Sequence, residues 1–192
     1  SIAERAVRHA LKRGATYADA RVQFEESAGF NISEGLIEEG GSASILGIGL
    51  RVVADGAWGF SSMDGAVAES RLVSLADGAV RLATQSAKCV FSSVDLALVK
   101  PVRVRIDVRS DSSFRAKEFD FESILEPSKE CDRRVRSVGN VIRAFSLSFT
   151  VGSFIDTFAS SEDSCITQAF DGYLGTLFVL ASDSGNTEYY PY

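Results

Sequence analysis

The sequence contains few of the residues that most often carry catalysis or cross-links: its 192 residues include one histidine, three cysteines and three prolines. A single histidine excludes a multi-histidine metal site built from this chain alone. The cysteines Cys89, Cys131 and Cys165 are odd in number, far apart and without a Cys-x-x-Cys pair, which argues against a disulfide framework or a cysteine zinc site. We expect all three to be reduced thiols that are buried as small apolar side chains.

Basic residues are also in the minority, with 20 Lys and Arg against 26 Asp and Glu and a formal charge of −6. This balance argues against a broad nucleic-acid or anionic-membrane surface, which requires clustered positive charge. No apolar run approaches the roughly 18 residues of a membrane span, and no apolar segment follows a basic start as in a signal peptide. Together with the thiols, these absences predict a cytoplasmic protein without membrane contact.

The remaining composition is that of an ordinary globular protein, with 45% apolar and 24% charged residues. Apolar spacing predicts a helix over residues 1–13, in which Ser1 and Glu4 have capping-box spacing. Alternating apolar and polar residues then predict antiparallel strands within 18–62. Asp55-Gly56 is a strong hairpin signal inside that segment.

The rest of the chain repeats the order of helix followed by strands. Helical spacing predicts a helix over 66–87, and alternation predicts a strand over 101–109 that buries its Val and Ile side. A further helix is expected over 127–135, starting at Pro127, because proline inside a helix costs about 3 kcal/mol whereas the first position tolerates it.

Strands are predicted to fill 138–182, with a turn at Gly152-Ser153 and a loosely held tail from Ser184. The predicted fold class is therefore α+β, a layered and mostly antiparallel sheet with two or three helices packed on it. We expect residues 1–192 to form a single domain of this kind.

Two aromatic residues, Trp58 and Phe60, follow the predicted hairpin turn on one face of the same strand. They can be core residues beneath the helices or, alternatively, an aromatic wall for a peptide. Ser61 and Ser62 have no visible base partner, so a serine nucleophile is not expected.

Three other features have simple structural interpretations. His9 has no carboxylate or cysteine placed near it by the sequence and is expected to be a structural or surface residue. Arg103, Arg105 and Arg109 could contact phosphate or carboxylate, but the aspartate within their stripe and the net negative charge favour a solvated strand face. Gly47-Ile48-Gly49 lies within a strand and not at a helix start, so nucleotide binding is not expected.

Three segments carry a more specific signal: Gly14-Ala15-Thr16-Tyr17-Ala18-Asp19-Ala20-Arg21-Val22, Gly47-Ile48-Gly49-Leu50-Arg51-Val52 and Asp55-Gly56-Ala57-Trp58-Gly59-Phe60-Ser61-Ser62. In this order they resemble the amino-terminal domain of the TldD/PmbA family. That family comprises zinc metallopeptidases and their non-catalytic partners, historically called modulators of DNA gyrase. The similarity is most specific over residues 3–62. Asp163 stands where relatives often have glycine after a Ser-Ser-Glu run.

The resemblance implies a two-domain peptidase whose zinc site, a His-Glu-x-x-x-His helix and a later cysteine, lies in the carboxy-terminal half. These 192 residues lack that motif. We therefore assign no catalytic residue and no metal ligand, and we expect no cofactor in this chain. Zinc is expected only in a missing carboxy-terminal half or in a partner.

The resemblance also implies a role, since the family's amino-terminal domain helps to form a dimer and a channel that holds the substrate extended. We expect a non-catalytic domain whose partners are a peptide or unfolded polypeptide and a TldD/PmbA-like chain, in a homodimer or heterodimer. The residues expected to contact peptide are Arg51, Trp58, Phe60, Ser61 and Ser62. Two alternatives stay open: a stand-alone module that binds peptides at a sheet edge, and, less favoured by charge, a gyrase- or DNA-associated protein.

Overall fold

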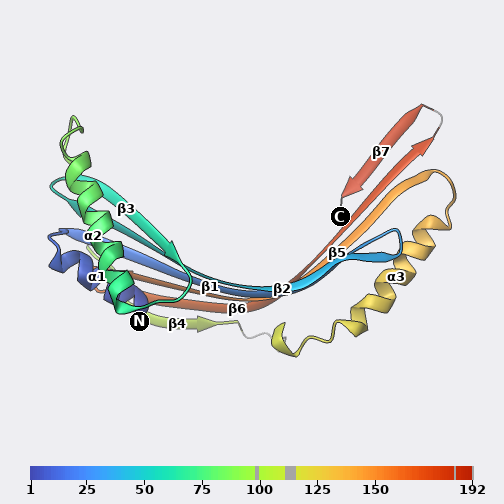
Figure 1. Cartoon of the computed structure of the whole chain (residues 1–192), viewed down its shortest axis with the longest axis horizontal. Helices are drawn as coiled ribbons and strands as arrows, with labels where there is room; N and C mark the ends of the chain where they lie inside the picture. Colours follow the sequence, from blue (N-terminus) through green and yellow to red (C-terminus); the bar gives the residue numbers. More distant parts are fainter. Residues whose placement is uncertain (98–99, 111–115, 184, 192) are drawn as a thin grey trace. The chain divides into compact units, whose positions relative to one another are not determined.

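The computed structural model describes residues 1–97, 100–110, 116–183 and 185–191. It is an α+β fold, as predicted, with helices on a largely antiparallel sheet (Figure 1). The helices are α1 (Ile2–Lys12), α2 (Glu69–Ser86) and α3 (Glu122–Arg136), and a short 3-10 helix spans Ala116–Glu118. The strands are β1 (Tyr17–Ser33), β2 (Leu36–Ala54), β3 (Ala57–Asp64), β4 (Arg105–Arg109), β5 (Ile142–Ser160), β6 (Cys165–Asp183) and β7 (Asn186–Pro191).

The strands form one sheet in the order β3-β2-β1-β5-β6-β4, and β7 pairs with β6. β3 and β4 are therefore edge strands, and β4 runs parallel to β6. None of the helices in the described part of the chain combines the length and the apolarity that a membrane crossing requires.

Contacts within the chain gather into two compact units, described separately below. Unit 1 contains residues 1–25, 45–110 and 154–170, and unit 2 contains residues 26–44, 111–153 and 171–192. The strands β1, β2, β5 and β6 contribute residues to both units. The single domain expected over 1–192 stays a prediction.

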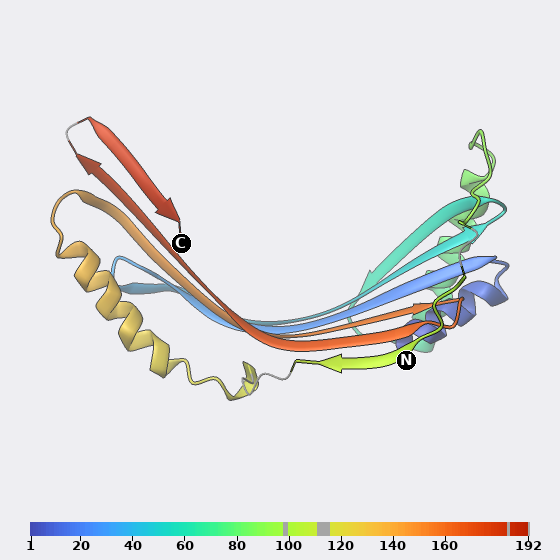
Figure 2. The ribbon, with the colours of Figure 1, turned by 180° about the vertical axis from the view of Figure 1, so that it is seen from behind.

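In unit 1, α1 and α2 cover one face of the sheet, as the views from both sides show (Figures 1 and 2). The buried sides of the two helices and every second residue of β1 and β2 form one apolar core. Its central members are Ala3, Ala6, Ala10, Ala18, Ala20, Val22, Leu50, Val52, Leu72, Leu75, Ala76, Ala79 and Ala83. Burial of a leucine such as Leu50 or Leu72, both 0% exposed, contributes about 2 kcal/mol.

Helix α1 begins as its sequence predicts. Ser1 Oγ accepts the Glu4 N–H at 3.2 Å, while the Glu4 carboxylate accepts from the Ser1 amino group at 2.7 Å. This reciprocal pair is the capping box expected from the spacing. Gly14 follows the last helical turn with φ 101°, a backbone conformation that glycine adopts without steric cost.

The hairpin of β2 and β3 also forms where it was predicted. Asp55 and Gly56 have φ values of 52° and 75°, as a two-residue type I′ turn requires. The register then runs without a slip from the turn to the end of β3. Gly59 faces α2 so closely that a Cβ atom there would lie 2.1 Å from the Ala79 carbonyl oxygen. Glycine at this position therefore allows the helix to lie directly on the strand.

In unit 2, aromatic rings from three strands and from the segment before α3 form a ladder centred on Phe149. Its ring centroid lies 6.1 Å from Phe30, 5.3 Å from Phe119 and 6.0 Å from Tyr173, in stacked geometry. Such pairs contribute about 0.5–1.5 kcal/mol beyond the apolar area that they bury.

Helix α3 contains an ion pair, four residues apart, whose carboxylate is buried. Asp132 is 2% exposed and accepts from Arg136 Nε at 2.8 Å. The same carboxylate lies against the turn between β1 and β2, where a Cβ on Gly35 would be 3.2 Å from Oδ2. Since Gly35 has φ 75°, the turn and the carboxylate both favour glycine at this position.

Several sequence predictions for the second half of the chain are wrong. Helix α3 starts at Glu122 and not at 127, so Pro127 lies inside it. The Asp120 carboxylate accepts the Glu122 N–H at 3.0 Å and so supports an earlier start. The turn expected at Gly152-Ser153 is absent because β5 continues through it, with neither residue at positive φ.

Two further corrections concern edges of the sheet. Residues 186–191 form β7, antiparallel to β6, where a loosely held tail was expected. The strand predicted over 101–109 is shorter, at 105–109, and is exposed along its whole length. Its Ile106 and Val108 are 48% and 47% exposed, because an edge strand outside the area covered by the helices has no apolar layer to bury them.

Candidate functional site

The side of the unit 1 sheet that α1 and α2 leave uncovered carries most of the residues expected to bind peptide. We call this side the open face. Strand alternation directs Trp58 and Phe60 to it, since Gly59 between them faces α2. Trp58 is 38% exposed and Phe60 is 58% exposed. The interpretation of this pair as core residues beneath the helices is therefore wrong.

Arg51 of β2 is held from two directions on the open face. Its Nε and Nη2 atoms donate to Oδ2 of Asp19 at 3.0 and 2.8 Å. Its guanidinium carbon lies 4.9 Å from the centroid of the Trp58 ring, and Tyr17 meets that ring edge-on with centroids 6.0 Å apart. Side chains from β1, β2 and β3 thus fix one another, so the guanidinium and the indole are positioned before any ligand arrives.

The same contacts set the protonation of the cluster. The hydrogen bond to Asp19 raises the pKa of Arg51 above its ordinary value. Burial, with the Asp19 carboxylate adding to the effect, raises the pKa of Tyr17 to about 12. Neither group changes its charge near neutral pH, so the Arg51 guanidinium stays protonated and able to donate hydrogen bonds to a ligand.

A hollow of about 800 Å³ lies on the open face beside this cluster. Its lining residues are Asp19, Arg21, Gln23, Gly47, Ile48, Gly49, Arg51, Phe60, Ser62, Met63, Asp64 and Phe158. On the β5 side, Arg21 forms an ion pair with Asp156 at 3.1 Å. The hollow therefore combines an aromatic wall with several hydrogen-bonding groups, which is the composition of a binding surface for an amphipathic ligand.

The structure places four of the five expected peptide-contacting residues on the open face, namely Arg51, Trp58, Phe60 and Ser62. Ser61 lies on the opposite side, where a Cβ on Gly78 of α2 would be 3.3 Å from its Oγ. Neighbouring residues of a strand face opposite sides, so Ser61 and Ser62 cannot share one surface. Contact of these residues with a peptide stays a prediction.

Sequence reasoning missed most of the residues that line the hollow, and Asp19 and Phe158 illustrate two different reasons. Asp19 could have been found, because it alternates with the buried Ala18 and Ala20 and must therefore face the other side of β1. Phe158 gave no comparable signal, since only the pairing of strands from distant segments brings β5 beside β1.

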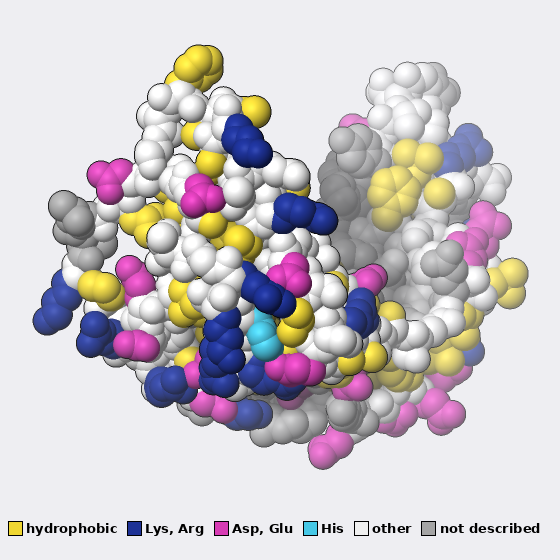
Figure 3. Space-filling model, turned by 60° about the vertical axis from the view of Figure 1, so that its left-hand side comes forward, with side chains coloured by type: hydrophobic (Ala, Val, Ile, Leu, Met, Phe, Trp, Pro, Cys, Tyr) yellow, Lys and Arg dark blue, Asp and Glu magenta, His cyan; other side chains and the backbone are white. Residues whose placement is uncertain are grey.

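The single histidine joins the two helices of unit 1. His9 Nε2 lies 2.6 Å from Glu69 Oε1, and the same carboxylate pairs with Arg5. Figure 3 shows the histidine on the surface among basic and acidic side chains. The structural or surface role expected for His9 agrees with this position.

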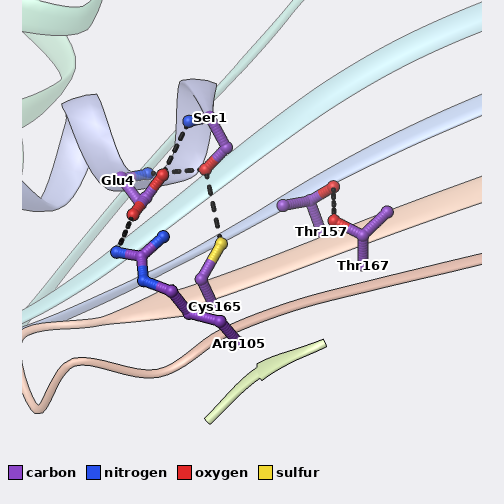
Figure 4. Close-up of polar contacts among 6 residues, drawn as sticks. All are labelled: Ser1, Glu4, Arg105, Thr157, Cys165 and Thr167. Carbon is purple, nitrogen blue, oxygen red and sulfur yellow. Dashed lines mark hydrogen bonds and ion pairs between the residues drawn. The ribbon is translucent and has the colours of Figure 1, made fainter. Parts of the chain in front are cut away.

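The arginine stripe before and within β4 is neutralised by carboxylates. Its three ion pairs are Arg103–Asp163 at 3.9 Å, Arg105–Glu4 at 2.6 Å and Arg109–Asp107 at 3.2 Å. Figure 4 shows the second of these, in which Glu4 is held by both Arg105 and the Ser1 amino group. The stripe is therefore a solvated, charge-paired strand face, as the sequence favoured.

The potential metal ligands are dispersed. Cys89 is exposed, and Cys131 and Cys165 are partly exposed, so the expectation that all three thiols are buried is wrong. Within the described ranges, no three side chains of His, Cys, Asp or Glu are grouped so that they could hold a metal ion. Since His9 is the only imidazole and pairs with a glutamate, the described residues do not fit the zinc site that the resemblance places in the family.

Residues 18–83 match a known protein family, described as PmbA/TldA metallopeptidase domain 1. The matched segment contains nearly all of β1, the β2–β3 hairpin and most of α2. No curated protein matches the chain.

Solved structures share the fold over nearly the whole chain. TldE from Thermococcus kodakarensis aligns with a TM-score of 0.74 and 12% identity, covering 100% of this chain and 43% of its own length. A protein described as a modulator of DNA gyrase from Bacteroides thetaiotaomicron aligns with a TM-score of 0.68 and 16% identity, covering 99% and 43%. Another described in the same way, from Thermotoga maritima, gives 0.60 and 12%, covering 99% and 41%.

These comparisons fit one another. At 12–16% identity the structural likeness shows the fold alone, and this chain spans about 43% of the length of the first two structures. The family match covers the segment that carries the Arg51 and Trp58 cluster. The resemblance found in the sequence motifs is thereby confirmed: residues 18–83 match the first domain described for the PmbA/TldA metallopeptidases, and the chain shares the fold of TldE and of the two proteins described as modulators of DNA gyrase.

Proposed function

We propose that this chain is a non-catalytic, peptide-holding and assembly domain of a TldD/PmbA-type zinc metallopeptidase system. One observation carries the proposal: Phe60 lines the 800 Å³ hollow and stays exposed, and the exposed Trp58 lies against Arg51, which lines the same hollow. Large aromatic side chains grouped on a surface mark interaction sites, and aromatics and arginine contribute most to such contacts. The family match makes polypeptide the favoured occupant.

The open face offers what an extended peptide needs. The two rings can cover apolar side chains, and the Arg51 side chain, 55% exposed, has N–H groups left to donate to a peptide carbonyl. The Ser62 hydroxyl can donate or accept beside it. Hydrolysis itself is assigned to a zinc site on other polypeptide, since the His-Glu-x-x-x-His motif is not among these 192 residues.

Assembly would use the opposite edge of the sheet. The charged residues of β4 disfavour strand pairing there, but its exposed Ile106 and Val108 side chains offer apolar contact to a second TldD/PmbA-like chain. Sedimentation velocity over a hundredfold concentration range should show a dimer that Ile106→Asp weakens.

We place the protein in the cytoplasm on the evidence of its three free cysteines.

Peptide holding can be tested by titrating the full chain with fluorescein-labelled, unstructured peptides and following the emission of Trp58, the only tryptophan. Phe60→Ala should weaken binding by about tenfold, as the loss of one well-placed ring predicts. Phe91→Ala removes an exposed aromatic outside the hollow and serves as the matched control. Absence of binding across a diverse panel, or equal effects of both variants, would contradict the proposal.

Two measurements separate the alternatives. A stand-alone module would bind peptide without any increase on addition of a TldD/PmbA-like partner, whereas a domain of a larger assembly should gain affinity from it. A DNA-associated protein would bind DNA at low salt and lose it steeply as salt rises. The charge-paired arginines predict no such binding.

A further inference from the structure

We propose that an extended peptide binds to the outer edge of β3 as an additional strand of the sheet. This inference rests on the proposed function and specifies where, and through which groups, the peptide is held. It follows from the direction of the main-chain groups of β3, from the lack of edge protection, and from a groove along the strand.

The register decides which main-chain groups point outward. A two-residue turn closes on a hydrogen-bonded pair, here Ala54 and Ala57, and bonded pairs then alternate along an antiparallel ladder. The bond from Gly65 N–H to Leu46 carbonyl at 2.9 Å confirms that odd-numbered residues of this segment face β2. The N–H and C=O groups of the even-numbered residues therefore point away from the sheet, at Trp58, Phe60 and Ser62.

This edge lacks the devices that usually block strand addition. Natural edge strands carry inward charges, prolines or bulges that prevent pairing. From Trp58 to Met63, β3 has no charged residue and no proline, and its register is regular. The other edge strand, β4, has the sequence Arg-Ile-Asp-Val-Arg and is protected by charge. An exposed, regular and uncharged edge is a template for a second extended main chain.

The edge is flanked on both sides by surfaces that can receive side chains. On the open face these are the rings of Trp58 and Phe60, which suit apolar side chains at every second position of the ligand. On the helix side, a hollow of about 240 Å³ lies between β3 and α2. Its lining residues are Ser61, Ser62, Met63, Arg71, Ser74 and Leu75.

Arg71, which lines this hollow, is fixed at the end of β3. Arg71 donates to the carbonyl oxygens of Asp64 at 2.7 Å and of Ala66 at 2.6 Å, so its guanidinium is fixed where β3 ends. The ligand class is therefore an extended, unfolded polypeptide segment with alternating apolar side chains. Such a segment complements both the main-chain groups of the edge and the two flanking surfaces.

Main-chain pairing is tested with a labelled peptide of alternating valine and serine, bound to the full chain, and two N-methylated versions of it. One version carries N-methyl groups on the valines and the other on the serines. In a paired strand only one of these sets faces β3, so one version should lose about tenfold or more in affinity and the other should not. Equal losses, or no loss in either, would overturn strand pairing.

Two separate proline variants provide the second test. Ser62→Pro removes an outward N–H without breaking the ladder to β2, and should weaken peptide binding by about tenfold. Asp107→Pro is the matched control on β4. The bonds from Cys165 N–H to the Val104 carbonyl and from Ser110 N–H to the Ala169 carbonyl show that even-numbered residues face β6, so the N–H of Asp107 points outward. This variant should leave peptide binding unchanged. Circular dichroism checks that both variants fold. If Ser62→Pro does not fold, the N-methylated peptides alone decide whether the ligand pairs with β3 as a strand.

The outcomes separate this inference from the proposed function. If the unmodified peptide binds but neither N-methylation nor Ser62→Pro matters, the open face still holds peptide and strand pairing is wrong. If no peptide binds, both fail. If Ser62→Pro instead dissolves a dimer of this chain in sedimentation velocity, the occupant of the edge is a second copy, and the peptide assignment is overturned.

Discussion

The guanidinium carbon of Arg51 lies 4.9 Å from the centroid of the Trp58 ring. The two residues belong to adjacent strands and sit in diagonal positions, since Arg51 is paired with Phe60 and Trp58 with Val53. The contact holds the indole on the open face, where 38% of the Trp58 surface stays exposed to a ligand. Because Trp58 is the only tryptophan, its emission reports directly on this site.

Replacing Arg51 by alanine should destabilise the protein by about 1–2 kcal/mol, because the 8%-exposed Asp19 would lose both of its hydrogen bonds to Arg51. The Trp58 emission of the folded protein should also shift. Urea unfolding followed by fluorescence measures both effects. Arg109→Ala removes an exposed pair and should cost less than about 0.5 kcal/mol; a similar loss in the two variants would count against the Asp19 contact.

Gly59→Ala should destabilise the protein by about 2–3 kcal/mol, since the new Cβ would lie 2.1 Å from the Ala79 carbonyl oxygen and 2.6 Å from the Ala83 nitrogen. Backbone atoms cannot turn aside as a flexible side chain can, so α2 has to move away from β3. Gly172→Ala is the control, because nothing lies within 4 Å of a Cβ there and its effect should stay within about 0.5 kcal/mol. Thermal unfolding followed by circular dichroism compares them.

Glu4 should make stability depend on pH in the acid range. Its hydrogen bond from the Ser1 amino group, and then that from Arg105, lower its pKa from 4.5 to about 2. A lowered pKa in the folded state means that the stabilisation is complete above pH 4.5 and is lost as the pH falls toward 2.

The urea midpoint of the wild type should therefore fall more steeply across that interval than the midpoint of Glu4→Gln, which cannot titrate. Arg105→Ala removes one of the two partners and should move the loss to higher pH. Parallel curves for the wild type and Glu4→Gln would show that this carboxylate does not couple to folding.

Asp132→Ala should destabilise unit 2 by about 2–3 kcal/mol, because it leaves the partly buried Arg136 side chain without its carboxylate. Glu126→Ala on the same helix removes the exposed pair with Lys129 and should cost no more than about 0.5 kcal/mol. Far-ultraviolet circular dichroism during urea unfolding measures both variants. A result in which Glu126→Ala costs as much as Asp132→Ala would contradict the role of the buried pair.

Local features of the fold could be predicted because the interactions that produce them span only a few residues. The capping box of Ser1 and Glu4 and the Asp55-Gly56 turn are formed by neighbours in the chain. Pro127 misled the prediction for α3, since an isolated proline at the sixth position of the helix costs less than the upstream turns contribute. The predicted and observed bounds of helices and strands differ most where a segment's conformation depends on the parts of the chain that pack against it.

The same distinction applies to the candidate site. The sequence motif identifies Trp58 and Phe60 as candidate residues. Alternation along a strand shows that the two share a face of the sheet, but it does not show whether the helices cover that face. Ser61 was grouped with Ser62 by sequence proximity, although strand geometry puts them on opposite sides. Phe158 belongs to the site only because the strand order places β5 beside β1, whereas the alternation of Asp19 with Ala18 and Ala20 already indicates its face of β1.

The sequence by itself determined the α+β class, the hairpin, the family motifs and the lack of a His-Glu-x-x-x-His segment, because each of these depends on residue identity and short-range spacing. Only the tertiary structure decided that the helices cover the face opposite Trp58, that Arg51 meets Asp19, and that the outer edge of β3 is regular and uncovered by a further described strand. These properties arise from strand order and helix placement, which bring together residues that no local pattern connects.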